Sequence, residues 1–175
     1  MTQNATQARL SVVWLLIRLY VGYQWLHAGW GKLTGGGFDA SGFIQGAINK
    51  ADPAVTANPT VQAWWASFLK GVAMPNIELF NFLVPVGEFL VGLALIFGFA
   101  TIFAACMGAL MNFSFMMSGS LSSNPVLFAL EFILVAAGGA YAGFLGVDYW
   151  FRPWFRQQLA RFTRNRRRPV PNPAT

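Results

Sequence analysis

The stretch NFLVPVGEFLVGLALIFGF, residues 81–99, decides the fold class, because it is long and apolar enough to cross a bilayer as a helix. One carboxylate, Glu88, interrupts it. A lone charge at mid-bilayer is unfavourable by about 2.5–3.5 kcal/mol on insertion scales. The stretch therefore predicts a membrane-spanning helix whose glutamate has either a polar partner or a function.

The rest of the chain has the composition of a membrane protein. Its 175 residues are 55% hydrophobic and only 10% charged, whereas about 25% of the residues of a soluble domain are charged. Four apolar runs predict an all-α fold, an integral membrane four-helix bundle in contact with lipid. The predicted spans cover about residues 10–33, 77–97, 100–117 and 125–147, within one membrane domain over 1–153 that precedes a basic tail over 154–175.

The distribution of positive charge predicts the orientation of the bundle. The net charge is +6, and arginines concentrate between residues 152 and 168. A basic segment that follows a membrane helix favours a cytoplasmic location over nucleic-acid binding, with anionic lipid as a secondary contact. With four spans, both termini are then cytoplasmic.

The segment over residues 34–76 then faces outward, and it is too long to be a simple connector. Within it, VQAWWASFLKGV (61–72) predicts a short interfacial helix, since Trp64 and Trp65 favour headgroup depth. Such a helix is either tethered to the surface or a lid over a pocket. Pro75 and Asn76 are expected to separate it from the second span, with Asn76 as the N-cap. The short link around Gly98 predicts a tight hairpin between spans two and three.

Depth counting suggests a partner for Glu88. At about 1.5 Å per residue, Arg18 lies roughly 12 Å from the inner edge and Glu88 roughly 16 Å from the outer edge. In a core of about 30 Å, the two charges come to similar depths. Gly22 and Gly92, each one turn away, would let the two helices approach closely. We therefore expect an Arg18–Glu88 ion pair.

Other polar residues fall in the outer half of the predicted bundle, among them His27, Lys32, Asn112 and Glu131. Ionisable residues within spans mark functional sites by default, although a purely structural role for Arg18 and Glu88 is the alternative. A single histidine more often donates a hydrogen bond than binds a metal, and it cannot build a zinc site alone. We therefore predict no metal site.

Several cofactor chemistries lack a sequence motif. The only cysteine, Cys106, can form neither an intramolecular disulfide nor a cysteine-held iron–sulfur site. No covalent haem motif is present, and no glycine-rich dinucleotide fingerprint indicates a flavin.

The chain resembles the DoxX/DoxD family of small four-helix membrane proteins of bacteria and archaea. The resemblance rests on an arginine followed by G-x-x-K-L in the first span, a glutamate in a glycine-rich second span, and matching pieces in the other two. Those pieces are RLYVGYQWLHAGWGKL (18–33), PNIELFNFLVPVGEFLVGLALIFGFAT (75–101), GALMNFSFMMSGSLSSNP (108–125) and AGGAYAGFLGVDYWFRP (137–153). The long outer loop with paired tryptophans is more similar to the DoxD-type members.

The resemblance implies a multi-pass protein of the cytoplasmic membrane of a prokaryote, acting as the membrane subunit of a thiosulfate:quinone oxidoreductase. Such an enzyme joins two thiosulfates into tetrathionate and passes electrons to quinone. It also implies a second redox subunit that this chain does not contain, and a homo-oligomer is a further expected assembly. By the family's motif the signature positions are Arg18, Lys32, Glu88, Asn112 and Asp148.

A quinone needs an aromatic slot, donors to its carbonyl oxygens and a proton supply, and the sequence offers candidates for each. The expected aromatic slot consists of Trp25, Trp30, Phe113 and Phe115. The expected cofactor-binding residues are Trp25, Trp30, Asn112 and Phe115. The expected catalytic residues, which donate to the ring or relay protons, are Arg18, His27, Glu88 and Glu131. Lys32 and His27 are expected to attract a thiosulfate dianion at the outer mouth.

Two alternatives use the same residues. The chain could be a non-enzymatic scaffold that anchors a redox partner, with a polar core that serves only assembly. It could instead be a small proton-coupled carrier, in which Glu88 and Glu131 form the relay.

Overall fold

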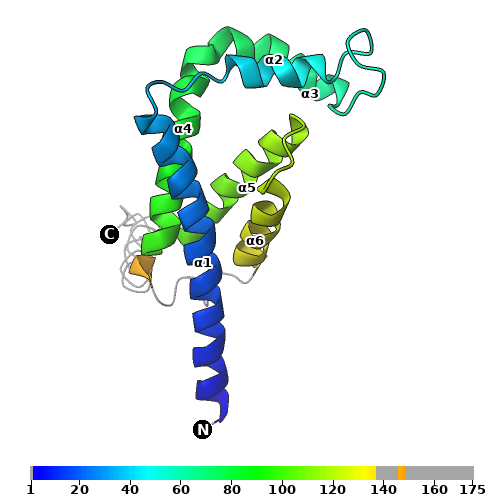
Figure 1. The fold of residues 1–175 in the computed structure, drawn as a ribbon. Helices are drawn as coiled ribbons and strands as arrows, with labels where there is room; N and C mark the ends of the chain where they lie inside the picture. The colour runs from blue at the N-terminus through cyan, green and yellow to red at the C-terminus, as the bar shows by residue number, and fades with distance from the viewer. Residues whose placement is uncertain (1, 137–145, 149–175) are drawn as a thin grey trace, which may run out of the picture.

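The structure, a computed structural model, describes residues 2–136 and 146–148, and the described chain is helical with no strand (Figure 1). The all-α prediction is therefore confirmed for this part of the chain. The helices in chain order are α1 (Thr2–Thr34), α2 (Ser41–Asn49), α3 (Ala63–Phe68), the π-helical turn η1 (Leu69–Ala73), the 3₁₀ turn η2 (Met74–Asn76), α4 (Ile77–Phe97), α5 (Thr101–Met117) and α6 (Asn124–Ala136).

The apolar runs predicted as spans form α1, α4, α5 and α6. Among the described helices, the continuous segment Ala63–Phe97 is long and apolar enough to cross a membrane, and α5 and α6 are shorter apolar helices. Part of the predicted fourth span, residues 137–145, and the predicted tail over 154–175 lie outside the described residues.

Helices α1 and α4 pack antiparallel at van der Waals distance because glycines face the partner backbone. A Cβ atom added to Gly92 would collide with the backbone of Leu26, and one added to Gly29 would collide with the backbone of Phe89. Any larger residue would force the helices apart. The predicted close approach at Gly22 and Gly92 is confirmed, and these contacts fix the register of α1 against α4.

The predicted short link between α4 and α5 around Gly98 is confirmed, but the two helices diverge from it and do not pack tightly along their length (Figure 1). We call the end of the bundle at this link the hairpin end. Gly98 ends α4 with a φ of 66°, in the left-handed region that favours glycine. The Asp148 carboxylate then accepts hydrogen bonds from the backbone N–H groups of Ala100 and Thr101, at 2.7 and 2.8 Å. Asp148 thus satisfies two donors at the start of α5 that have no partner within the helix.

At the other end the chain forms a cap, which we define as α2, α3 and η1. A buried cluster holds the cap together, and it contains Ala40, Ile44, Ala47, Leu69 and Ala73. The α2 helix was not predicted. Ile44 and Ala47 share one face of α2 and bury it in this cluster.

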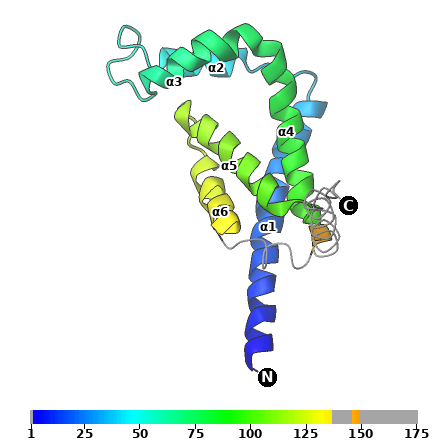
Figure 2. The ribbon, with the colours of Figure 1, turned by 180° about the vertical axis from the view of Figure 1, so that it is seen from behind.

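The junction between the cap and α4 differs from the prediction. The predicted interfacial helix over 61–72 forms α3 and η1, but it continues through η2 into α4 as one bent helical segment (Figures 1 and 2). Asn76 does not cap α4 with its side chain, because its Nδ2 donates backward to the Val72 carbonyl at 2.8 Å. Pro75 is accommodated in the 3₁₀ turn, so the helical path bends here instead of ending.

Polar contacts attach the cap to both sides of the bundle. On α4, the Asn81 Oδ1 accepts a hydrogen bond from the Ala40 N–H at 2.8 Å. At the end of α5, Trp65 Nε1 donates to Ser118 Oγ at 2.9 Å, and Lys50 Nζ donates to the Gly119 carbonyl at 3.2 Å. The cap therefore bridges α4 and α5 across the space between them, the arrangement expected of a lid.

Candidate functional site: two adjoining cavities beneath the cap

A polar cavity of about 430 Å³ lies at the cap end of the bundle, between α1, α4, α5 and the start of α6. It gathers most of the side chains that the sequence selected, namely Trp25, His27, Lys32, Glu88, Asn112 and Phe115. The turn between α5 and α6 contributes hydroxyl groups that the sequence analysis had not selected, from Ser120, Ser122 and Ser123. Their signal was the polar run SGSLSSNP, which indicates a turn but not a cavity wall.

Glu88 is held by Lys32, and the expected Arg18–Glu88 ion pair is wrong. Lys32 Nζ lies 2.7 Å from Glu88 Oε1 and 2.5 Å from Oε2. The Glu88 side chain is 2% exposed, whereas that of Lys32 is 30% exposed. The carboxylate is thus buried on the floor of the cavity, with its cation reaching toward the opening.

The error came from the register of the two helices. Depth counting assumed that each span meets the membrane edge at its first apolar residue. The packing instead sets Gly29 against Phe89, which places Lys32 beside Glu88. Lys32 follows Gly29 by one turn on the same face of α1, so matching the small residues of the two helices would have found the pair.

Arg18 lies at the hairpin end, where its guanidinium packs against Gly98 and Gly146. Gly98 is about 15 Å from Glu88 along the axis of α4. Asp148 lies close enough to attract the guanidinium electrostatically while it caps α5. Arg18 is 1% exposed and lines neither of the cavities described in this section.

Glu131 is fully buried directly behind the polar cavity. Trp25 Nε1 donates to its Oε1 at 2.5 Å, and Asn112 Nδ2 donates to its Oε2 at 2.8 Å. Gly108 makes room for the carboxylate, since a Cβ there would collide with Glu131 Oε1 and lie 3.0 Å from Trp25 Nε1. Three of the predicted site residues therefore form one hydrogen-bonded cluster, although the sequence predicts a catalytic role for Glu131 and cofactor binding for Trp25 and Asn112.

Of the predicted aromatic residues, Phe115 lies in the cavity wall and Trp30 does not. Phe115 lines the cavity and lies 6.4 Å from Trp25 and 6.0 Å from Phe43, measured between ring centroids. Trp30 is 58% exposed and packs on Phe89, outside the cavity. The expected aromatic slot therefore includes Phe43 of the cap in the place of Trp30.

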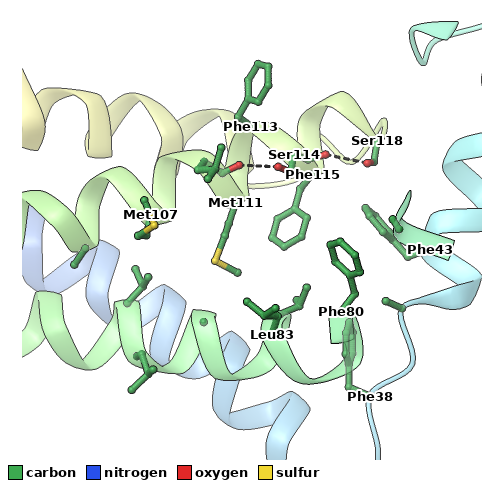
Figure 3. A pocket seen from close by; sticks show the side chains of 18 of the residues that line it. Phe38, Phe43, Phe80, Leu83, Met107, Met111, Phe113, Ser114, Phe115 and Ser118 are labelled. Carbon is green, nitrogen blue, oxygen red and sulfur yellow. Dashed lines mark hydrogen bonds between the residues drawn. The ribbon is translucent and has the colours of Figure 1, made fainter. Parts of the chain in front are cut away.

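A second, apolar cavity of about 1070 Å³ adjoins the first, between α4 and α5 and beneath the cap (Figure 3). Phe115 and Met111 of α5 point toward Phe80 and Leu83 of α4 across this space. Four side chains, Phe38, Phe43, Val84 and Phe115, line both cavities and so mark their junction. The combined space suits an amphipathic ligand with a compact polar head and a long apolar tail.

The family model described as DoxX matches residues 13–119 of this chain. The chain belongs to the DoxX family. The match begins within α1 and ends just after α5, so it includes Lys32, Glu88 and Asn112, whereas Glu131 and Asp148 follow it. No curated protein and no solved structure matches the chain. DoxX proteins are membrane-associated, and a membrane-associated chain is consistent with the long apolar helical segment.

Proposed function

We propose that this DoxX protein is an integral protein of the cytoplasmic membrane that binds quinone in the two adjoining cavities, as the membrane subunit of a quinone-linked oxidoreductase. The observation that carries the proposal is the junction of a polar cavity with a larger apolar one. A membrane quinone has the same division into a ring with two polar oxygens and an apolar tail.

Exposed apolar side chains on all four long helices support insertion in lipid. Leu16 on α1, Phe82 on α4, Phe103 on α5 and Phe132 on α6 are each exposed by 61–66%. Large apolar side chains exposed along every helix of a bundle are typical of a surface that contacts lipid and not water. By the positive-inside rule the termini are cytoplasmic, so the cap and the polar cavity lie on the outer side.

The polar cavity offers the groups that a quinone ring requires. Lys32 carries three N–H donors and uses two on Glu88, which leaves one for a ring oxygen. Glu88, Glu131 and His27 are groups that can hold or release a proton near the ring. Phe43 and Phe115 provide an aromatic wall. The tail would occupy the apolar cavity between α4 and α5.

For the electron donor we propose thiosulfate or a related sulfur anion. Two thiosulfates that couple to tetrathionate release two electrons, and a quinone that accepts two electrons takes up two protons. Lys32 and His27, at the wall of a cavity open to the outer side, would attract the anion. The electrons reach the quinone from the bound sulfur anion or through a second redox subunit.

The test is thiosulfate-dependent reduction of a decyl-substituted benzoquinone by membranes that contain the chain. We expect reduction in the wild type, a strong loss in Lys32→Gln, and normal activity in Lys70→Gln, which removes an exposed lysine of the cap. Quinone in lipid extracts of the purified protein should fall in Lys32→Gln as well.

Other outcomes would favour a different function. Bound quinone without thiosulfate-dependent reduction would contradict thiosulfate as the electron donor but would support the quinone site. A stable protein partner with no bound quinone would favour the scaffold. Substrate-driven proton flux in liposomes would favour the carrier.

A further inference from the structure

Asn112, which lines the polar cavity, has a buried side-chain oxygen with no hydrogen-bond partner among the described residues. Asn112 is fully buried and lines the cavity, and its Oδ1 accepts no hydrogen bond. A buried acceptor without a partner costs about 1–3 kcal/mol. An acceptor of this kind at a cavity wall suits a ligand that brings its own O–H or N–H donor.

The orientation of the Asn112 amide follows from Glu131. Trp25 Nε1 can only donate, so it occupies Glu131 Oε1 whatever the state of the carboxyl group. Oε2 then faces Asn112. When Glu131 is ionised, Oε2 must accept, and Asn112 turns its Nδ2 toward it, as observed. The Asn112 amide oxygen then points away from Glu131.

Protonation of Glu131 would reverse this arrangement. A proton on Oε2 makes it a donor, which needs the Asn112 oxygen as its acceptor. Rotation of the amide by half a turn satisfies this bond and places the NH₂ group where the unpartnered oxygen had been. The cavity wall then carries a donor in place of an acceptor.

We infer that Asn112 makes the cavity selective for one redox form of its ligand, according to whether Glu131 is protonated. This inference rests on the proposed quinone site. Ionised Glu131 presents the Asn112 oxygen, which accepts from a quinol hydroxyl but repels a quinone carbonyl. Protonated Glu131 presents the NH₂ group, which donates to a quinone carbonyl. Asn112 is therefore a positioning residue that links a proton on Glu131 to the redox form bound.

Glu131→Gln tests the link, because Trp25 fixes the direction of the new amide. The Gln oxygen must face Trp25 Nε1, so its NH₂ group faces Asn112 and holds Asn112 in the orientation that donates to the cavity. We expect the ratio of the dissociation constants for decyl-benzoquinone and decyl-benzoquinol to shift about tenfold toward the quinone, or about 1.4 kcal/mol. Asn112→Leu should abolish this shift when combined with Glu131→Gln.

The control is Lys70→Gln, which changes an exposed side chain of the cap that lines neither cavity. Its ratio should stay within about twofold of the wild type, below the tenfold shift expected for one hydrogen bond. A Glu131→Gln ratio equal to the wild-type ratio, in a protein that binds both ligands, would overturn the inference. Failure of the wild type to bind either ligand would overturn the proposed function instead.

A measurement on the wild type makes the test independent of variant folding. Infrared difference spectra between the quinone-bound and quinol-bound protein should contain the stretch of one protonated carboxyl group only in the quinone-bound state. Calorimetry in buffers of different ionisation enthalpy should show that quinone binding takes up more protons than quinol binding. Equal proton uptake for both ligands would contradict the link, whether or not the variants fold.

Discussion

The bundle buries a charged group at each of its two ends, and the two surroundings differ. At the cap end, Lys32 and Glu88 form an ion pair in the wall of the polar cavity, and Lys32 reaches toward its opening. At the hairpin end, Arg18 is enclosed by the backbone of Gly98 and Gly146, and Asp148 spends both its oxygens on the start of α5. The first pair adjoins space for a ligand, whereas Arg18 and Asp148 close a helix junction.

This difference divides into two groups the five positions that the resemblance to the family had implied as signature positions. Lys32, Glu88 and Asn112 surround the polar cavity, and Arg18 and Asp148 hold the α4–α5 hairpin. Burial of a charge was therefore not enough to identify the site. What separates the groups is the adjoining cavity, which Lys32, Glu88 and Asn112 line and which Arg18 and Asp148 do not.

The largest expected effect is on stability and comes from Arg18→Gln. Arg18 is 1% exposed and lies close enough to Asp148 for electrostatic attraction, so its replacement removes a buried charge that stabilises a buried carboxylate, at a cost of about 3 kcal/mol. We expect a large drop in folded yield and in the thermal unfolding midpoint of detergent-solubilised protein. The molecules that do fold should bind the quinone analogue with unchanged affinity.

Arg18→Lys provides the control for this substitution, because it keeps the charge while losing the planar fork that packs between the two glycines. It should recover part of the lost stability. If Arg18→Gln folded normally but lost quinone binding, Arg18 would belong to the ligand site. That result would contradict the structural role assigned to the hairpin end.

Glu88→Gln should have the opposite profile, with a smaller effect on stability and a larger one on binding. Lys32 is partly exposed and can be solvated when its partner is neutral, so the cost in stability is about 2 kcal/mol, as for a hydrogen bond to a charged group. Lys32 would lose its fixed position beside the cavity. We expect quinone affinity to fall about tenfold or more, measured by equilibrium titration.

The Glu88→Lys and Lys32→Glu double exchange tests whether the pair acts through its charge alone. If it does, the double variant should regain stability lost in each single exchange. Restored stability without restored binding would show that the position of the lysine at the opening matters for the ligand. Unchanged binding in Glu88→Gln would contradict a functional role for the pair.

The sequence predicted the long helices well because their signals are local. Long apolar runs bounded by Asn76, Gly98 and Asn124 identify α4, α5 and α6 without reference to any other helix. The Lys32–Glu88 pair depends on the register between α1 and α4, which glycine contacts such as Gly29 against Phe89 decide. An apolar helix face is compatible with several registers against its neighbour. Depth counting therefore placed the wrong cation beside Glu88.

The cap was the least predictable part for a related reason. The sequence at η2 predicts a helix end, because a proline and a capping residue occur together there. The helical path continues through η2 instead, since the Asn76 side chain donates back to the Val72 carbonyl. A hydrogen bond from Trp65 to Ser118 also holds α3 on α5. Such contacts between segments distant in sequence leave no local pattern in the chain.

The smallest expected effect concerns the start of the cap, where Asp39 organises the first turn of α2. Its carboxylate accepts hydrogen bonds from the N–H and the hydroxyl group of Ser41, at 2.9 and 2.5 Å, and these bonds lower the pKa of Asp39 below its ordinary value of 3.8. A lowered pKa in the folded state means that the stabilisation is complete above the ordinary value. It is lost as the pH falls below 3.8 and through the folded-state pKa.

Asp39→Asn should therefore lower the thermal unfolding midpoint slightly at neutral pH, and the difference from the wild type should vanish in acid. Asp52→Asn, which changes an acidic residue in the same segment, controls for the loss of charge alone. Phe38 precedes Asp39 and lies with its ring centroid 5.5 Å from Lys32 Nζ, so a loosened first turn also reaches the wall of the polar cavity. If quinone affinity follows the same acid dependence in the wild type but not in Asp39→Asn, the cap controls the ligand site as a lid. If affinity is indifferent to Asp39 while stability is not, the cap is a structural cover, and the cap end resembles the hairpin end more closely than its cavity suggests.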